Sequence, residues 1–302
     1  MKPPPRQTRR RLMEMFQALG LHPRTDLGQN FLIDLNLLEY IVAQADLQAE
    51  DVALEVGAGT GSLTALLAQH AGHVVSIEVD PRMYALARAA VAEYANVTLL
   101  NCDALKSKNR FAPEVLAAIE AALAGVGSQS LKLVANLPYN IATPVVSNLV
   151  ATDLCWKRMV VTVQWELALR MAAPPGDPHY GALAVWLQSQ ARVEILKKLS
   201  PKVFWPRPKV ESAIVRIDPD PEAAARIADR AFFHDFVRRL FIHRRKFLRS
   251  VLGSMFRKQL GKAAVDALLT ELNIPPEKRA DMLSIEELIA LSNRFHSALA
   301  DR

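Results

Sequence analysis

Between residues 52 and 164, short apolar runs rich in β-branched residues alternate with segments of helical periodicity. The apolar runs predict strands at 52–56, 73–79, 97–101, 131–135 and 159–163. The segments between them predict helices near 62–70, 81–93, 112–124 and 141–151. Strands that alternate with helices form a parallel sheet with both faces covered. The sequence therefore predicts an α/β fold built on a parallel sheet.

The rest of the chain changes character. Two alternating apolar runs, 192–199 and 210–217, flank the proline-rich segment 200–209 and predict an antiparallel hairpin that closes the sheet. From 232 to 299 the pattern predicts short amphipathic helices. We therefore expect three parts: an N-terminal extension over 1–24, an α/β domain over 25–219 and a smaller all-helical domain over 220–302.

Charge is unevenly distributed along these parts. The chain has 37 basic and 31 acidic side chains, for a formal net charge of +6. Residues 25–196 carry an acidic excess, whereas residues 1–24 hold six basic side chains against one acidic. Residues 230–262 hold ten basic side chains against one acidic, with phenylalanines between them. A solvated helix face is the plainer interpretation of a charge run, but this concentration favours a surface that binds a phosphate backbone.

Cysteine content and the N-terminus limit the compartment and the cofactor. With only Cys102 and Cys155, a disulfide framework and an all-cysteine zinc site are both excluded. Neither a signal peptide nor an apolar run of membrane-spanning length is visible in the sequence. We expect a cytoplasmic protein that contacts no membrane and holds no metal.

A glycine-rich turn follows the first predicted strand, in the segment Glu55-Val-Gly57-Ala-Gly59-Thr-Gly61. Glycines at such a turn let the backbone approach a ligand, and the following helix offers free N–H groups. A dinucleotide fingerprint would need a glycine where Ser62 stands, and no Gly-Lys-Ser/Thr of a P-loop is present. The Gly-x-Gly-x-Gly pattern instead resembles the S-adenosylmethionine loop of class I methyltransferases.

Carboxylates end the next two predicted strands. Glu78 closes the second strand, where it can accept both hydroxyl protons of a ribose, and Asp103 closes the third, where it can accept from an adenine amine. In open α/β sheets, ligands bind at the carboxyl ends of the strands. A strand-end carboxylate alone is more often a helix cap. Together with the glycine turn, the two indicate a nucleoside cofactor.

The fourth predicted strand ends in Asn136-Leu-Pro-Tyr139. An exocyclic amine is a poor nucleophile because its lone pair is delocalised into the ring, so a site that methylates it must favour the pyramidal amine. The Asn136 side-chain oxygen and the carbonyl of Leu137 or Pro138 can each accept an N–H, while Tyr139 can stack on the base. No strong general base is required, which agrees with the lack of a Ser/His/Asp or Cys/His arrangement.

From about residue 24 to 297 the chain resembles the KsgA-type ribosomal RNA adenine dimethyltransferases. The segments that carry the resemblance are Leu27-Gly-Gln-Asn-Phe-Leu32, Glu55-Val-Gly-Ala-Gly-Thr-Gly61, Glu78-Val-Asp80, Asp103, Asn136-Leu-Pro-Tyr-Asn-Ile141, Phe204-x-Pro-x-Pro-Lys-Val210 and Arg244-Arg-Lys-x-Leu-Arg249. The sequence departs from the family in a longer segment before the fourth strand and in Trp165, where a lysine is common.

The resemblance implies a class I methyltransferase fold, with S-adenosylmethionine bound in the domain over 25–219 and RNA or the ribosome by 220–302. The implied cofactor-binding residues are Gln29, Asn30, Leu32, Gly57, Gly59, Gly61, Glu78, Asp103, Ala104 and Asn136. The implied catalytic residues are Asn136, Leu137, Pro138, Tyr139 and Phe204, with Tyr139 and Phe204 flanking the target adenine and Phe31 shaping the pocket. The implied RNA-binding residues are Arg244, Arg245, Lys246 and Arg249.

The implied reaction is the dimethylation of N6 on two adjacent adenosines in the 3′-terminal hairpin loop of small-subunit (16S) ribosomal RNA. The implied partner is that RNA within the small subunit, and we expect a monomer. One alternative is an erythromycin-resistance-type methyltransferase that acts on 23S RNA. Others are a non-catalytic RNA-binding or transcription factor with the same fold, and a small-molecule methyltransferase, which has no use for the basic segment 230–262.

Overall fold

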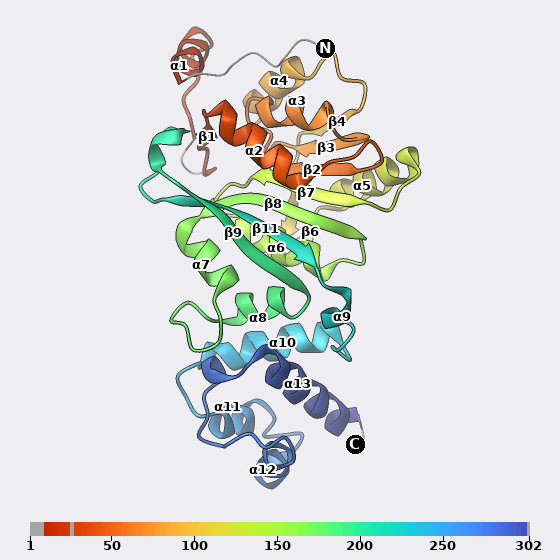
Figure 1. Ribbon diagram of the computed structural model, residues 1–302, viewed down its shortest axis with the longest axis vertical. Helices are drawn as coiled ribbons and strands as arrows, with labels where there is room; N and C mark the ends of the chain where they lie inside the picture. The colour runs from red at the N-terminus through yellow and green to blue at the C-terminus, as the bar shows by residue number, and fades with distance from the viewer. Residues whose placement is uncertain (1–8, 25–26, 301–302) are drawn as a thin grey trace. The chain divides into compact units, whose positions relative to one another are not determined.

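The computed structural model describes residues 9–24 and 27–300. The expected basic extension thus lies partly outside the described residues. The chain forms two compact units (Figure 1): the first runs up to Ala168 and includes Glu194–Asp218, and the second combines Leu169–Val193 with the chain from Pro219 onward. The sequence placed Leu169–Val193 in the first domain, whereas its contacts group it with the C-terminal helices.

The first unit is built on a seven-stranded sheet with the order β4-β3-β2-β7-β8-β11-β9. These strands are β2 (Val52–Val56), β3 (His73–Ile77), β4 (Val97–Leu100), β7 (Leu131–Asn136), β8 (Trp156–Gln164), β9 (Ala191–Leu199) and β11 (Ser212–Pro219). The first five run parallel, and β11 pairs antiparallel with β8. The predicted α/β class and mostly parallel sheet are confirmed.

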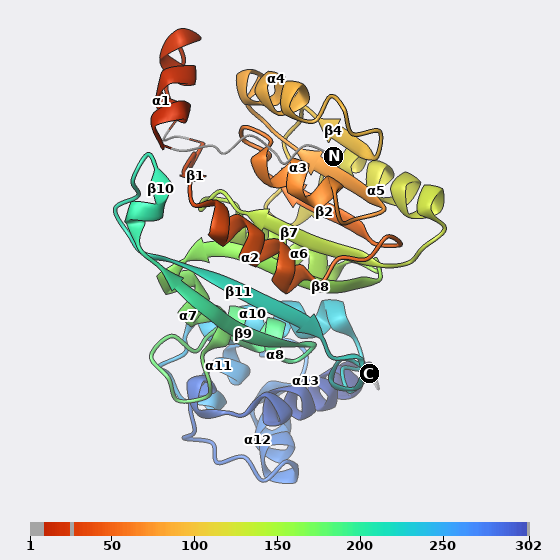
Figure 2. The ribbon, with the colours of Figure 1, turned by 45° about the horizontal axis from the view of Figure 1, so that its top comes forward.

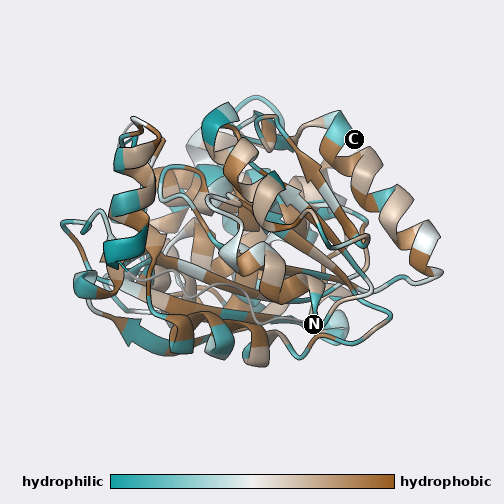
Figure 3. Ribbon diagram, turned by 90° about the horizontal axis from the view of Figure 1, so that it is seen from above, coloured by the Kyte–Doolittle hydropathy of each residue, from teal (hydrophilic) through white to brown (hydrophobic). Residues whose placement is uncertain are grey.

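Helices cover both faces of the sheet (Figure 2). The helices of this unit that follow or precede the parallel strands are α2 (Leu35–Ala45), α3 (Ser62–Ala68), α4 (Pro81–Ala90), α5 (Pro113–Val126) and α6 (Ala142–Ala151). Apolar side chains of α2 and α3 pack on one face against β2, β3, β7, β8 and β11. The strands carry the brown of hydrophobic residues in Figure 3, as expected where both faces of a parallel sheet are buried.

Several small elements of the first unit were not predicted. A two-residue pair joins β1 (Phe31–Leu32) to β10 (Phe204–Trp205), which follows the 3₁₀ turn η1 (Pro201–Val203). The strands β5 (Leu105–Ser107) and β6 (Arg110–Phe111) form a second pair. Ahead of them all, helix α1 (Arg9–Ala18) buries Leu12 and Phe16. Pairs this short lie below the length at which a sequence pattern becomes visible.

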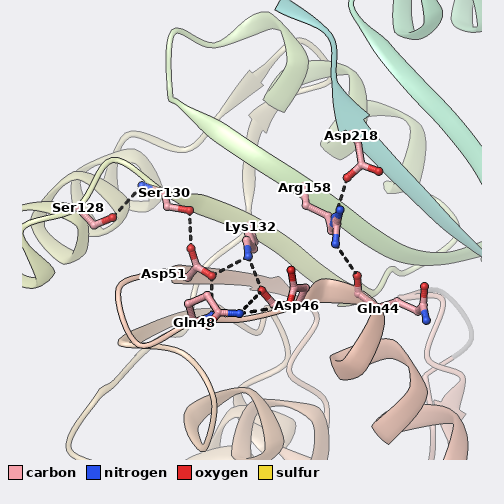
Figure 4. A network of polar contacts seen from close by, with 9 residues as sticks. All are labelled: Gln44, Asp46, Gln48, Asp51, Ser128, Ser130, Lys132, Arg158 and Asp218. Atoms are coloured by element: carbon pink, nitrogen blue, oxygen red, sulfur yellow. Dashed lines mark hydrogen bonds and ion pairs between the residues drawn. The ribbon is translucent and has the colours of Figure 1, made fainter.

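Polar groups gather at the amino ends of β2 and β7 (Figure 4). Lys132 Nζ lies 2.7 Å from an Asp51 carboxylate oxygen and donates to the Asp46 carbonyl at 2.5 Å. Asp51 also accepts from the Gln48 N–H at 2.7 Å and from the Ser130 hydroxyl. Asp51 is 3% exposed and Lys132 9% exposed, so this end of the sheet buries an ion pair whose hydrogen bonds are satisfied.

The second unit is helical. Its elements are the end of α7 (Trp165–Ala172), α8 (Ala182–Gln188), α9 (Pro221–Ala224), α10 (Arg230–Ile242), α11 (Leu248–Met255), α12 (Gly261–Glu271), the 3₁₀ turn η2 (Ala280–Met282) and α13 (Ile285–Ala300). Phe236, Phe256 and Phe295 pack ring against ring with centroids 5.1–6.1 Å apart. No helix within residues 9–24 and 27–300 is long and apolar enough to cross a membrane.

Candidate active site

A cleft opens at the carboxyl ends of β2, β3 and β7, and it encloses about 840 Å³ including its open mouth. Of the residues singled out in the sequence, the cleft is lined by Gln29, Asn30, Gly57, Gly59, Glu78, Asp103, Ala104, Asn136, Leu137, Pro138 and Tyr139. Leu32, Gly61 and Phe204 do not line it, and Arg244, Arg245, Lys246 and Arg249 belong to the second unit.

The glycines of the turn have two different roles: one keeps space in the cleft, and the other lets two helices pack closely. Gly57 has φ +90° and a Cβ there would come within 3.1 Å of the Pro138 ring, so a side chain would crowd the cleft. Gly61 has φ +82°, but its missing Cβ makes room for α4, because a Cβ would lie 2.9 Å from the Ala87 Cα. Gly61 therefore permits α3 and α4 to pack closely and lies outside the cleft lining. The sequence analysis expected Gly61 to contact the cofactor, but Gly61 is not among the residues that line the cleft.

Glu78 is held by the backbone of this turn. One carboxylate oxygen accepts from the Gly59 N–H at 2.8 Å, and the other accepts from the Asp80 N–H at 2.9 Å. Burial raises the pKa of Glu78 above its ordinary value, although these N–H groups oppose the shift. Asp103 and Ala104 line the cleft after β4, and Asp103 accepts from the Leu105 N–H at 2.9 Å. Both predicted carboxylates thus lie at one edge of the sheet.

Glu55 lies beneath the cleft on β2 and is 1% exposed. Its carboxyl group accepts from the Thr64 hydroxyl at 2.5 Å and from the Ser76 hydroxyl at 2.6 Å. Burial raises the pKa of Glu55 to about 7, against these two hydrogen bonds, which lower it. This carboxyl group joins β2 to Thr64 of α3 and Ser76 of β3, one residue before the cleft-lining Val56.

The segment 27–32 forms one wall of the cleft. Gln29 donates from its amide to Asp80 at 3.1 Å, and it accepts from the Arg24 N–H at 2.8 Å. The backbone of Asn30 lies beside Asn136, as described below. Leu32 is 7% exposed and packs into the core with α2 instead of facing the cleft. The structure therefore places Gln29 and Asn30 at the site and Leu32 behind it.

Asn136 is the last residue of β7, and its amide is buried. The Nδ2 atom donates to the Asn30 carbonyl at 2.8 Å. The Oδ1 atom is buried without a hydrogen-bond partner among the described residues. An unpartnered buried acceptor costs about 1–3 kcal/mol, and proteins keep such groups mainly where a ligand completes them. Because Nδ2 donates to Asn30, Oδ1 is the atom of this cleft-lining amide that is left to accept a hydrogen bond.

Tyr139 is fixed at its far end. Its hydroxyl lies 2.6 Å from the hydroxyl of Ser212, which is fully buried on β11. Burial raises the pKa of Tyr139, so the phenol stays protonated. The Leu137 N–H donates to the Thr162 carbonyl at 3.2 Å, and the Pro138 carbonyl accepts from the Ile141 N–H at 3.1 Å. The Asn136–Tyr139 segment is therefore a rigid turn with an aromatic ring on the cleft.

Phe204 does not reach the cleft. Its ring is 2% exposed and packs in the core cluster with Leu32 and Leu199, and β10 pairs it with Leu32. In this arrangement Phe204 is not placed to flank a base as the sequence analysis expected. The reason is the β1–β10 pairing, which turns Phe204 toward the core and Trp205 toward Phe31. No local pattern in the sequence shows this pairing.

The four basic residues that the resemblance implied for RNA binding divide into two pairs. Arg244 donates to the carbonyls of Pro178 and Tyr180 at 2.9 and 3.1 Å, and Arg249 makes a bidentate contact with Asp266 at 2.5–2.6 Å. Arg245 and Lys246 are exposed. Lys246 lines a groove with Arg249, Arg257, Lys262 and the 56% exposed Phe247. This groove gathers basic side chains of the segment 230–262, and Arg257 and Lys262 add to those of the motif.

Other residues of the site were missed in the sequence. Asp80 caps α4 by accepting from the Arg82 N–H at 2.9 Å and also anchors Gln29. The Asp-Pro pair at the start of a helical pattern is a cap signal that predicts the first role. Cys102 lines the cleft as well, and nothing in the sequence predicts its place there.

The residues match a known family. Residues 20–291 match the protein family described as "Ribosomal RNA adenine dimethylase". The chain is 37% identical to the ribosomal RNA small subunit methyltransferase A of Halothermothrix orenii over 93% of this chain and 90% of that protein. It is 39% identical to the protein of the same name from Lactiplantibacillus plantarum, over 95% of both.

Solved structures agree on the fold. A dimethyladenosine transferase from Plasmodium falciparum superimposes with a TM-score of 0.73 at 24% identity, covering 88% of this chain and 97% of that one. The 23S rRNA methyltransferase ErmE superimposes with a TM-score of 0.62 at 24% identity, covering 88% of this chain and 99% of that one. Because the family match extends over most of this chain, the chain belongs to the ribosomal RNA adenine dimethylases.

Proposed function

We propose that this enzyme uses S-adenosylmethionine to dimethylate N6 of two adjacent adenosines in the 3′-terminal hairpin loop of small-subunit ribosomal RNA. Family membership supports the reaction class, and the relatives named as small subunit methyltransferases support the choice of RNA. The observation that carries the proposal is the Asn136 Oδ1 atom, which is buried without a partner among the described residues and belongs to a residue that lines the cleft.

The cleft fits the proposed cofactor. Gly57 leaves room that a Cβ would fill, and each oxygen of Glu78 keeps a second lone pair for a ribose hydroxyl after accepting one N–H. Asp103 and Ala104 lie on the next strand end, where an adenine would be held. When bound, S-adenosylmethionine supplies a methyl group on a positively charged sulfur, which suits the acidic excess of residues 25–196.

The residues of the Asn136–Tyr139 turn would prepare the acceptor amine. Asn136 Oδ1 accepts one N6–H, and the Leu137 carbonyl accepts the other, because the Pro138 carbonyl already accepts from Ile141. Both hydrogen bonds would favour the pyramidal amine, whose lone pair would then be free to take the methyl group that bound S-adenosylmethionine supplies. The surplus N6 proton would pass to solvent water after the transfer, so no strong base is needed. Tyr139 stacks on the base, which must be extruded from its helix to reach it.

The second unit would provide the docking surface. Arg245, Lys246, Arg257 and Lys262 are the side chains we assign to the RNA backbone, with Phe247 exposed among them. Arg244 and Arg249 shape this surface through their contacts with Tyr180 and Asp266. We propose that the protein acts as a monomer in the cytoplasm on the small ribosomal subunit.

The test is methyl transfer to small subunits that lack the modification. Purified protein with labelled S-adenosylmethionine should label these subunits and leave methylated subunits and large subunits unlabelled. Mapping the labelled positions should find two adjacent adenosines near the 3′ end, each with two methyl groups. Label confined to 23S RNA would assign the protein to the erythromycin-resistance type instead, and cofactor binding without any transfer would contradict the proposed reaction.

A further inference from the structure

Helix α1 lies apart from the helices that cover the sheet, and two side chains hold it in place. Leu12 and Phe16, one helical turn apart, are 1% and 2% exposed, whereas Met13 on the same helix is 45% exposed. A helix of ten residues is marginal by itself in water. The stripe formed by Leu12 and Phe16 therefore determines where α1 lies.

That stripe packs against residues that border the cleft. Leu12 and Phe16 form one apolar cluster with Phe31 of β1 and Met83 of α4, with Trp205 of β10 packed against it. The Phe16 ring meets the Phe31 ring edge-on with centroids 5.5 Å apart, and meets Trp205 edge-on at 4.9 Å. Figure 2 shows α1 beside β1 and β10. Edge-on aromatic pairs contribute about 0.5–1.5 kcal/mol beyond their burial.

Phe31 is at once a member of this cluster and a wall of the cleft. A Cβ on Gly59 would lie 3.0 Å from Phe31 Cε1, so the ring rests directly on the glycine turn. Phe16 and Trp205 contact the same ring. Phe31 is thus held between the turn proposed to bind the cofactor and the stripe of α1.

Asn30, the residue before Phe31, fixes the orientation of the Asn136 side chain. The Asn30 carbonyl accepts from Asn136 Nδ2 at 2.8 Å, and this bond fixes the rotation of the amide, leaving Oδ1 as its free acceptor. If the 30–31 backbone shifts, the amide loses the bond that keeps Oδ1 directed at the substrate. A shift of about 1 Å in a positioned group costs up to about 100-fold in rate.

We propose that α1 is part of the active site, and that Phe16 is a positioning residue which holds Phe31 against the glycine turn and thereby orients Asn136. This inference rests on the proposed function, because it assumes that the cleft holds S-adenosylmethionine and that Asn136 receives the amine. It gives the N-terminal extension a role in the chemistry in addition to any contribution of its arginines to RNA binding.

The test compares Phe16→Ala with Met13→Ala, an exposed position on the same helix, and with Val115→Ala, a fully buried position in α5. We expect Phe16→Ala to weaken binding of S-adenosylhomocysteine, measured by calorimetry, and to lower kcat, each by about 10- to 100-fold. The KM for the RNA substrate should stay within about twofold because the second unit is untouched. Trp205 emission should shift to the red as its ring becomes exposed, with Trp205→Phe as the reference.

The controls separate positioning from general stability. Met13→Ala should match the wild type in both affinity and kcat, and Val115→Ala should lower the unfolding midpoint without changing affinity for S-adenosylhomocysteine. If Phe16→Ala is unfolded at the assay temperature, the milder Leu12→Val should show the same two losses at smaller size. Phe16→Leu should recover part of both because it restores apolar volume.

Three results would overturn the inference, and they are distinguishable. A folded Phe16→Ala variant with wild-type affinity for S-adenosylhomocysteine and wild-type kcat overturns the role of α1 alone. A wild-type protein that does not bind S-adenosylhomocysteine overturns the proposed function, and the inference with it. A loss in Val115→Ala as large as that in Phe16→Ala would reduce α1 to a stabilising element.

Discussion

The two ends of strand β7 handle polar groups in opposite ways. At the amino end, Lys132 pairs with Asp51 and also donates to the Asp46 carbonyl. At the carboxyl end, four residues on, the Asn136 amide makes one hydrogen bond and leaves a buried oxygen with no partner among the described residues. Since both groups belong to one strand, the difference is not one of fold. A satisfied polar network supports the sheet, whereas an unsatisfied acceptor is available for chemistry.

Carboxyl groups on and beside β2 show the same contrast. Asp51, just before the strand, is compensated by Lys132 and by hydrogen bonds from Gln48 and Ser130. Glu55, near the other end, accepts from the hydroxyls of Thr64 and Ser76, and its pKa rises to about 7. Burial is thus compensated by an ion pair at one end, whereas at the other it raises the pKa of the carboxyl group.

The largest expected effect is at the amino end. Lys132→Met should lower the free energy of unfolding by about 3–5 kcal/mol, because Asp51 is left buried without its partner. Denaturant unfolding measures this loss, and kcat of the folded variant should match the wild type. In Lys132→Met combined with Asp51→Asn, much of the stability should return. If the single variant is as stable as the wild type, the ion pair does not support the sheet.

Next is Asn136→Ala at the carboxyl end. It should reduce methyl transfer by about 100- to 1,000-fold, the size found when one positioned hydrogen-bonding group is removed from an active site. Single-turnover assays on unmodified small subunits measure the rate, and RNA binding should persist. Asn148→Ala, at a buried asparagine of α6, is the matched control and should retain activity. A rate for Asn136→Ala within threefold of the wild type would contradict the assignment of the acceptor.

The third effect is a pH dependence from Glu55. Its pKa is about 7 in the folded protein against 4.5 ordinarily, so the folded state holds the proton more tightly. The stability that this provides is fully present below pH 4.5 and is lost as the pH rises through 7. Glu55→Gln mimics the protonated carboxyl, so its stability relative to the wild type should grow by about 3 kcal/mol at most between pH 5 and 8.

Unfolding of both proteins in urea across this pH range measures the difference. Glu50→Gln, at an exposed glutamate, is the control and should differ from the wild type by less than about 0.5 kcal/mol at every pH. A constant difference between Glu55→Gln and the wild type would show that the Glu55 carboxyl is ionised in the folded protein throughout.

The smallest effect concerns the support of Tyr139. Ser212→Ala removes the hydroxyl 2.6 Å from the tyrosine hydroxyl and should cost about 1 kcal/mol, seen as a roughly fivefold rise in KM for RNA. Affinity for S-adenosylhomocysteine should be unchanged, and Ser212→Thr should restore the wild-type KM. In a Tyr139→Phe background the Ser212→Ala change should have no further effect on KM. An additive effect would show that the two hydroxyls act independently.

Most of the framework could be predicted from the sequence. Strand–helix alternation places the parallel sheet, and Glu78, Asp103 and Asn136 lie at the edge of that sheet where the parallel strands end, as expected. These features are local in the chain: strand periodicity, a glycine turn and a strand-end side chain each extend over a few residues. The carboxyl ends of parallel strands must then meet at one edge of the sheet.

What the sequence did not provide depends on pairings between distant residues. Phe204 was expected beside the substrate, but its pairing with Leu32, 172 positions away, turns the ring into the core. Gly61 was expected at the cofactor, but the approach of α4 accounts for it. No local pattern carries either contact.

The sequence by itself determined the class of fold, the family and the edge of the sheet where the chemistry takes place, because these follow from short patterns repeated along the chain. Only the tertiary structure decided which side chains reach the cleft, which acceptor is left without a partner, and that α1 reaches the wall of the site through Phe16 and Phe31. The physical reason is that hydrogen-bond satisfaction and close packing depend on the atoms that surround a group in space, most of which come from distant parts of the chain.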